Sequence, residues 1–93
     1  MPVTFQIPPA LRGFSAGREQ VDIGGSPATV GEALEALWVL LPGLRDRVVT
    51  EEGQIRSHVN VFVGDENVRY TGGLATPVSE GAEILIFHAV SGG

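Results

Sequence analysis

The residues best suited to chemistry in this 93-residue chain are its last two, Gly92 and Gly93. They end a short tail, Ala89-Val90-Ser91, that follows the apolar run "EILIFH" at 83–88. Because glycine lacks a Cβ, such a tail can thread a narrow channel and adopt backbone angles closed to other residues. A carboxylate at the tip is inert until ATP converts it to an acyl-adenylate, and sulfur attack then leaves a thiocarboxylate. The pattern predicts that the carboxylate of Gly93 is the reactive group and that residues 89–92 thread the active sites of partners; a frayed terminus is the alternative.

No other group of residues in the sequence predicts catalysis. His58 and His88 lie on predicted strands with no Asp or Glu at metal-ligand spacing. No serine has the strand–turn–helix context of a nucleophile elbow. The chain has no lysine, which rules out a P-loop, and no cysteine, which rules out disulfides and thiolate metal sites. We therefore predict a protein that is not an enzyme, has no catalytic or metal-binding residues and binds no cofactor, since a carrier of an activated terminus needs no catalytic side chain of its own.

Length and composition indicate one ordered domain over residues 1–93, with 89–93 as a flexible tail. The chain is 43% hydrophobic and 18% charged, which suffices for a single core. Its net charge is −5 and its six positive residues are scattered arginines, so we expect no binding to nucleic acid. No apolar stretch is long enough for a membrane span and no secretory signal is visible. The expectation is a cytoplasmic protein, monomeric when free, that does not bind membranes.

The elements that must position the tail follow from hydrophobic periodicity and turn signals. Thr29 and Glu32 form a capping box at the start of a helix that Pro42 ends. Segment 43–57 is expected to be a loop with at most one helical turn. The predicted helix spans 30–41, and the predicted strands span 3–7, 18–23, 58–63, 68–70 and 83–88.

The order strand, strand, helix, strand, strand, strand predicts an α+β fold of the β-grasp type, a mixed sheet over one main helix. In that fold the first and last strands lie side by side in parallel. One face of the sheet then meets the helix, and alternation assigns to it Val3, Phe5, Ile7, Val21, Ile23, Val59, Val61, Val63, Ile84 and Ile86. The other face keeps Phe62, Leu85 and Phe87, which a small monomer is not expected to expose. We predict that these three residues form a partner interface.

The length, the layout and the ending "GAEILIFHAVSGG" resemble the ubiquitin-like sulfur carrier proteins of the ThiS/MoaD family. The signature is Glu80-Gly81, an acidic residue and an apolar strand before the Gly-Gly tail. Within the family, residues 59–81 are most similar to carriers that serve a route of cysteine biosynthesis. The resemblance implies that an E1-like adenylating enzyme of the ThiF/MoeB type consumes ATP to convert Gly93 to a thiocarboxylate. No trimming is expected, because nothing follows Gly93.

The resemblance also implies partners that use the sulfur. The acceptor would be a PLP-dependent cysteine synthase or an enzyme of the thiosugar synthase type, and a metalloprotease would release the carrier-bound product. Two other functions stay open. One is the small subunit of molybdopterin synthase, which would bind a large subunit stably. The other is a ubiquitin-like modifier joined to lysines of other proteins, or a plain docking module.

Overall fold

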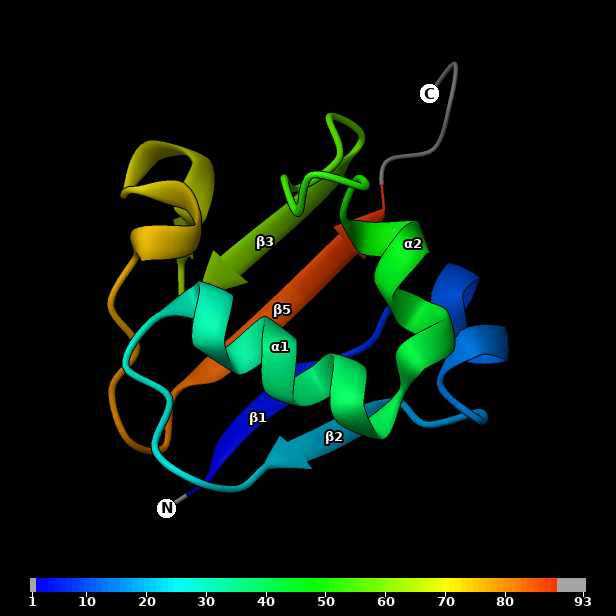
Figure 1. The fold of residues 1–93 in the computed structure, drawn as a ribbon. Coiled ribbons are helices and arrows are strands. Elements are labelled where there is room, and N and C mark those ends of the chain that lie inside the picture. The colour runs from blue at the N-terminus through cyan, green and yellow to red at the C-terminus, as the bar shows by residue number, and fades with distance from the viewer. Residues whose placement is uncertain (1, 89–93) are drawn as a thin grey trace.

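Five strands form one mixed sheet in the computed structural model, which describes residues 2–88. The strands lie in the order β2-β1-β5-β3-β4. β1 and β5 pair in parallel, and the other neighbouring pairs are antiparallel. Figure 1 shows helix α1 lying across one face of this sheet, with β5 in the middle. The predicted β-grasp arrangement is confirmed. The bounds of the strands are β1 (Val3–Gln6), β2 (Gln20–Ile23), β3 (Val59–Val63), β4 (Glu66–Asn67) and β5 (Glu83–His88).

Helix α1 (Val30–Leu40) begins at the predicted capping residues. Thr29 Oγ1 accepts a hydrogen bond from the Glu32 backbone N–H at 3.2 Å. The Glu32 carboxylate accepts from the backbone N–H of Ala28 at 3.0 Å, one residue earlier than in the standard capping box. The helix ends at Leu40, one residue before its predicted end and two before Pro42. Local capping signals therefore locate this helix to within one residue.

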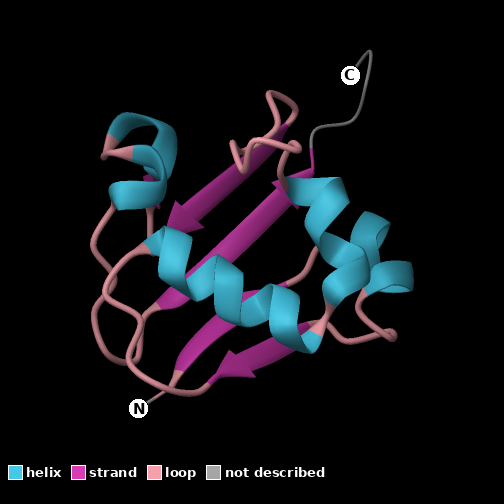
Figure 2. Cartoon of the chain, in the orientation of Figure 1, coloured by secondary structure: helices cyan, strands magenta, loops and turns pink. Residues whose placement is uncertain are grey.

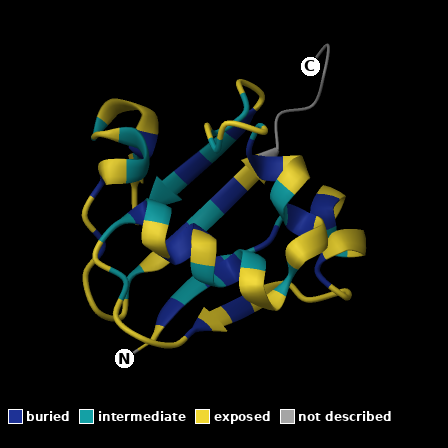
Figure 3. Cartoon of the chain, viewed as in Figure 1, coloured by how far each residue is buried: buried dark blue, intermediate teal, exposed yellow. Residues whose placement is uncertain are grey.

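The core lies between α1 and the sheet. All ten sheet residues predicted to face the helix do so: nine are buried, and Val63 is partly buried against them. Figure 3 shows the buried residues, in dark blue, gathered on the strands beneath α1. Burying an aliphatic or aromatic side chain of this size stabilises the fold by about 1.5–3 kcal/mol. The helix contributes four buried residues to the core: Val30, Ala33, Leu34 and Leu37.

Segment 43–57 is more ordered than the predicted loop with at most one helical turn. It forms a 3-10 turn, η2 (Pro42–Leu44), followed at once by the short helix α2 (Arg45–Val48). A single β-bridge then joins Val49 to Ile55. Three residues of this segment, Leu44, Val48 and Val49, are buried at 2% exposure or less. Figure 2 shows these turns continuing from the end of α1. The segment is thus held in place by its buried side chains together with local backbone hydrogen bonds, such as that from the Arg56 N–H to the Val48 carbonyl at 3.0 Å.

The prediction of a strand over residues 68–70 is wrong. The hairpin after β3 uses only two turn residues, Gly64-Asp65, so the returning strand β4 is Glu66–Asn67. Gly64 has a φ of 60°, as the first position of a type II′ hairpin turn requires. Residues 68–70 instead form the 3-10 helix η3, capped by the Asn67 side chain, which accepts from the Arg69 backbone N–H at 2.9 Å. Because the turn is short, the chain pairs with β3 at residues 66–67 and enters η3 at residue 68.

Two further 3-10 helices occupy segments predicted to be irregular, η1 (Pro9–Phe14) and η4 (Gly73–Ala75). η1 adds the buried Leu11 to the core. The strand predicted at 18–23 begins two residues later, at Gln20. Among the described residues, no helix combines the length and the apolar character needed to cross a bilayer.

Candidate functional site

The tail predicted to react leaves the sheet from β5, its central strand. β5 pairs with β1 on one side and with β3 on the other. Its last described residue, His88, is the register partner of Val59. The predicted tail residues lie outside the described part of the chain: Ala89, Val90, Ser91, Gly92 and Gly93. The structure therefore locates the point from which the tail departs, and the chemistry assigned to Gly93 stays a prediction.

An apolar patch lies on the face of the sheet that α1 does not cover. We call Phe62, Leu85 and Phe87 the apolar patch. Phe62 and Leu85 are register partners on β3 and β5, and both are partly buried. The rings of Phe62 and Phe87 meet edge to face, with centroids 5.4 Å apart and planes at 88°. Phe87 remains 48% exposed. The patch is thus preformed and open, while its use as a partner interface stays a prediction.

The other half of the same face is polar. Thr4 Oγ1 on β1 donates to the Asp22 carboxylate on β2 at 2.9 Å. Gln6 Nε2 lies 3.1 Å from the Glu83 carboxylate at the start of β5 and 3.4 Å from Gln20 Oε1 on β2. These polar side chains therefore form hydrogen bonds with one another across neighbouring strands.

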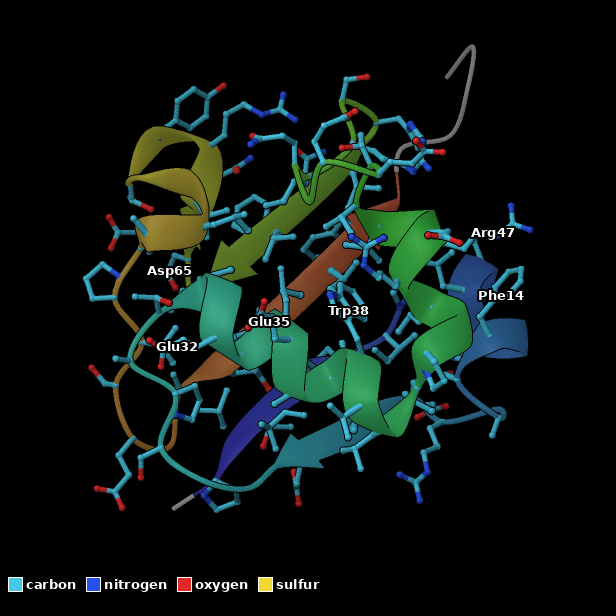
Figure 4. The ribbon with its side chains drawn as sticks, in the orientation of Figure 1. Phe14, Glu32, Glu35, Trp38, Arg47 and Asp65 are labelled. Carbon is cyan, nitrogen blue, oxygen red and sulfur yellow. The ribbon has the colours of Figure 1, made fainter. Side chains whose placement is uncertain are left out.

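Arginines gather where β5 ends, a feature that sequence reasoning missed. The guanidinium carbon of Arg47 on α2 lies 4.4 Å from the centroid of the Phe14 ring on η1. Arg56 Nε donates to the backbone carbonyl of Asp46 at 2.8 Å. Figure 4 shows Arg47 beside Phe14, on the opposite side of the view from Asp65 and Glu32. Phe14 is distant in the sequence from Arg47 and Arg56, so no local pattern could have grouped the three residues.

Other polar residues of types that can act in catalysis have structural roles instead. Ser15 is buried, and its hydroxyl donates to the backbone carbonyl of Arg18 at 2.8 Å, which closes the turn before β2. The "TGGLAT" segment forms η4, where the hydroxyls of Thr71 and Thr76 lie 3.0 Å apart. Within residues 2–88 no three His, Cys, Asp or Glu side chains come together as a possible metal site.

Comparisons with known proteins agree with this geometry. The family model described as the ThiS family matches residues 10–93. Sulfur carrier protein CysO of Mycobacterium tuberculosis is 36% identical over 95 aligned residues, which cover 100% of each chain. A chain in the crystal structure of the Amycolatopsis orientalis BexX/CysO complex superposes with a TM-score of 0.88 and 38% identity, covering 98% of this chain and 99% of that one. Small archaeal modifier protein 1 of Haloferax volcanii is 38% identical over 74 residues, which are 80% of this chain and 79% of the relative.

These relatives are named as carriers and modifiers, not as catalysts, which agrees with the prediction that the chain is not itself an enzyme. The resemblance read from the ending "GAEILIFHAVSGG" is confirmed by the family match, which includes that segment. The similarity to a sulfur carrier named CysO extends over the full length of the chain, including residues 59–81. On this basis the chain belongs to the ThiS family.

Proposed function

We propose that this chain is a sulfur carrier and that the carboxylate of Gly93 becomes a thiocarboxylate. The observation that supports the proposal most is the match of the ThiS family model to residues 10–93, a range that includes both terminal glycines. The placement of β5 in the centre of the sheet agrees with it. A rigid central strand gives the tail a fixed origin, so a partner that holds the domain also fixes where the tail enters its active site.

The chemistry requires two steps on the terminal carboxylate. In the first, a carboxylate oxygen attacks the α-phosphorus of ATP on an E1-like enzyme of the ThiF/MoeB type, and pyrophosphate leaves. In the second, the sulfur of a sulfide donor attacks the carbonyl carbon of the acyl-adenylate. AMP leaves and the sulfhydryl proton passes to solvent, so the product is the thiocarboxylate. The carrier itself supplies no cofactor in either step.

We propose that the sulfur enters cysteine or a related sulfur metabolite, such as a thiosugar or another natural product. The acceptor would be a PLP-dependent cysteine synthase or an enzyme of the thiosugar synthase type, and a metalloprotease would release a carrier-bound product. The full-length similarity to a sulfur carrier named CysO supports this assignment. The structure of the Amycolatopsis orientalis CysO in complex with BexX supports docking of such a carrier onto a second protein.

A second candidate function is protein modification. Its support is the 38% identity to small archaeal modifier protein 1, over 80% of this chain. A modifier would use the same acyl-adenylate but transfer the Gly93 carbonyl to a lysine amine of a target protein. The two functions therefore share the activation step and differ in the group that attacks next.

The test is a charging assay with the E1-like enzyme of the source organism, ATP and sulfide, read by intact mass spectrometry. Wild type should gain the mass of one sulfur in place of one oxygen. Deleting Gly93, or adding one alanine after it, moves the carboxylate by about 3.5 Å. A displacement of that size can slow a reaction about a hundredfold, whereas the melting temperature should not change because no core residue is touched. Equal charging of either variant would contradict the proposal. Isopeptide-linked adducts on lysines of target proteins would favour the modifier.

A further inference from the structure

Helix α2 bridges the two segments that flank the end of β5. On one side, η1 follows β1, whose Gln6 is the register partner of Leu85. On the other side, Arg56 precedes β3, and the Val59 backbone N–H donates to the Arg56 carbonyl at 3.0 Å. α2 reaches both segments: Arg47 packs over the ring of Phe14 on η1, and the Val48 carbonyl accepts from the Arg56 backbone N–H at 3.0 Å. Figure 1 shows α2 beside the end of β5. Arg47 and Arg56 therefore flank the point where the chain leaves the sheet.

Within residues 2–88, neither of these guanidinium groups forms an ion pair with a carboxylate. The ion pairs among the described residues are Arg12 with Glu19 at 3.7 Å and Arg45 with Asp46 at 3.3 Å. Arg47 faces an aromatic ring, which orients a cation but leaves its charge in place. Arg56 is anchored through Nε to a backbone carbonyl, so its two terminal nitrogens have no partner within residues 2–88. Both cations are thus held in position with no carboxylate partner among the described residues, on a chain whose net charge is −5.

The opposite end of β5 carries the opposite charge. β5 begins at Glu83, and the Glu83 carbonyl accepts from the Gly64 backbone N–H at 3.0 Å. That bond places the turn residue Asp65 and its neighbour Glu66 beside the start of the strand, and Glu80 lies three residues before it. Carboxylates therefore gather where β5 begins. Near its end lie Arg47 and Arg56, and the one carboxylate between Arg45 and Arg47, that of Asp46, pairs with Arg45.

We infer that Arg47 and Arg56 form a cationic rim at the base of the tail and bind carboxylates that border the tail-accepting channel of a partner enzyme. The inference rests on the proposed function, because the partner in question is the one that activates Gly93. Guanidinium groups bind carboxylates through paired hydrogen bonds. During diffusional encounter, the unequal charge at the two ends of β5 orients the domain, so that the end carrying Arg47 and Arg56 approaches an acidic surface first. A nucleic acid is the wrong partner, since the net charge and the acidic end repel a polyanion.

The rim is tested by measuring association with the E1-like activating enzyme in stopped-flow at low and high salt. The test variant carries Arg47→Gln and Arg56→Gln, which lowers the net charge by two. The matched control carries Ser26→Glu and Ser79→Glu, two exposed positions away from the rim, and lowers the net charge equally. We expect the test variant to associate about three- to tenfold more slowly at low salt. The difference should shrink below about twofold near 1 M salt, where the Debye length is about 3 Å. The control should associate within about twofold of wild type at either salt concentration.

A third variant, Phe14→Leu, keeps both charges but removes the ring beneath Arg47. An association rate between those of wild type and the test variant would show that the ring positions the cation.

The charging assay, run in parallel, separates the two proposals. If wild type is charged and the test variant associates as fast as the control, the rim is wrong and the carrier function stands. If wild type is not charged but the test variant still associates more slowly, the carrier function fails and the rim stands. If association is unchanged and only the KM for ATP rises, the arginines contact the nucleotide and the docking inference is overturned.

Discussion

The face of the sheet that α1 leaves uncovered has two halves, and both face solvent. The halves differ in whether their side chains find partners within the domain. On β1 and β2, polar side chains bond to one another, as Thr4 does to Asp22 at 2.9 Å. On β3 and β5, the apolar patch has aromatic and aliphatic side chains, and Phe87 remains 48% exposed. The polar half is well solvated, so covering it with a partner gains little free energy. The apolar patch contacts water unfavourably, so burying the patch in an interface is favourable. The comparison teaches that exposure alone does not mark a docking surface.

The largest expected effect separates the two faces of β5. Ile86 points into the core and is 2% exposed, whereas its neighbour Leu85 belongs to the apolar patch on the other face. Ile86→Ala should lower the free energy of unfolding by about 2–5 kcal/mol, because it leaves a cavity. Leu85→Ala should cost clearly less, since the patch is already open to solvent. Urea unfolding of both variants measures the difference, and equal losses would show that the open face is also part of the core.

The next effect separates the two halves of the open face. Phe87→Glu should weaken binding to the E1-like enzyme about ten- to a hundredfold, as expected for a central aromatic anchor of an interface. Gln20→Glu adds the same charge to the polar half and should change binding by less than about twofold. Gln20→Glu should keep nearly the stability of wild type, whereas Phe87→Glu should lose about 0.5–1.5 kcal/mol with its contact to Phe62. If Phe87→Glu instead lost several kcal/mol of stability, the ring would be a core residue, and the assignment of the patch to docking would have no support.

A smaller effect concerns the aromatic pair within the patch. The edge-to-face contact of Phe62 with Phe87 should contribute about 0.5–1.5 kcal/mol beyond buried area. A double-mutant cycle with Phe62→Leu and Phe87→Leu measures this coupling in the unfolding free energy. A coupling near zero would mean that the edge-to-face contact of the two rings adds no stability of its own.

The smallest effect is expected in the polar half. Thr4→Val keeps the side-chain shape and removes the hydrogen bond to Asp22, so the unfolding free energy should change by less than about 1 kcal/mol. Binding to the E1-like enzyme should not change. A clear loss of binding would mean that the polar half also touches the partner, and the contrast between the halves would not hold.

Local patterns predicted the elements whose signals are complete within a few residues. Thr29 and Glu32 stand three residues apart and located the start of α1, since both hydrogen bonds of the cap are local. Alternation along β3 and β5 assigned each side chain to its face, because a strand has a period of two. The inward position of Ile84 and the outward position of Phe87 follow from that parity alone.

Other features depend on contacts that no short window contains. A two-residue turn at Gly64-Asp65 places β4 at Glu66–Asn67, and the pairing with β3 stops at Asn67. The alternation of apolar and polar residues could not reveal that the strand ends before Val68. In segment 43–57 the four-residue spacing of Leu44 and Val48 is a helical signal, but it is too short to outweigh the surrounding polar residues. The rim formed by Arg47 and Arg56 arises only from the tertiary packing of α2, and sequence reasoning had no access to it.

The position of β5 also bears on how the chain is made. β1 and β3 do not touch along the sheet, because β5 separates them in the order β2-β1-β5-β3-β4. During synthesis the ribosome releases two separate strand pairs, each with open edges, and they cannot join until residues 83–88 emerge. A message or ribosome that stops early therefore leaves an unfolded product, which cellular proteases remove. Every molecule that completes its sheet has therefore received the strand that leads to residues 89–93, so a chain that stops before residue 83 cannot present a folded domain to a partner.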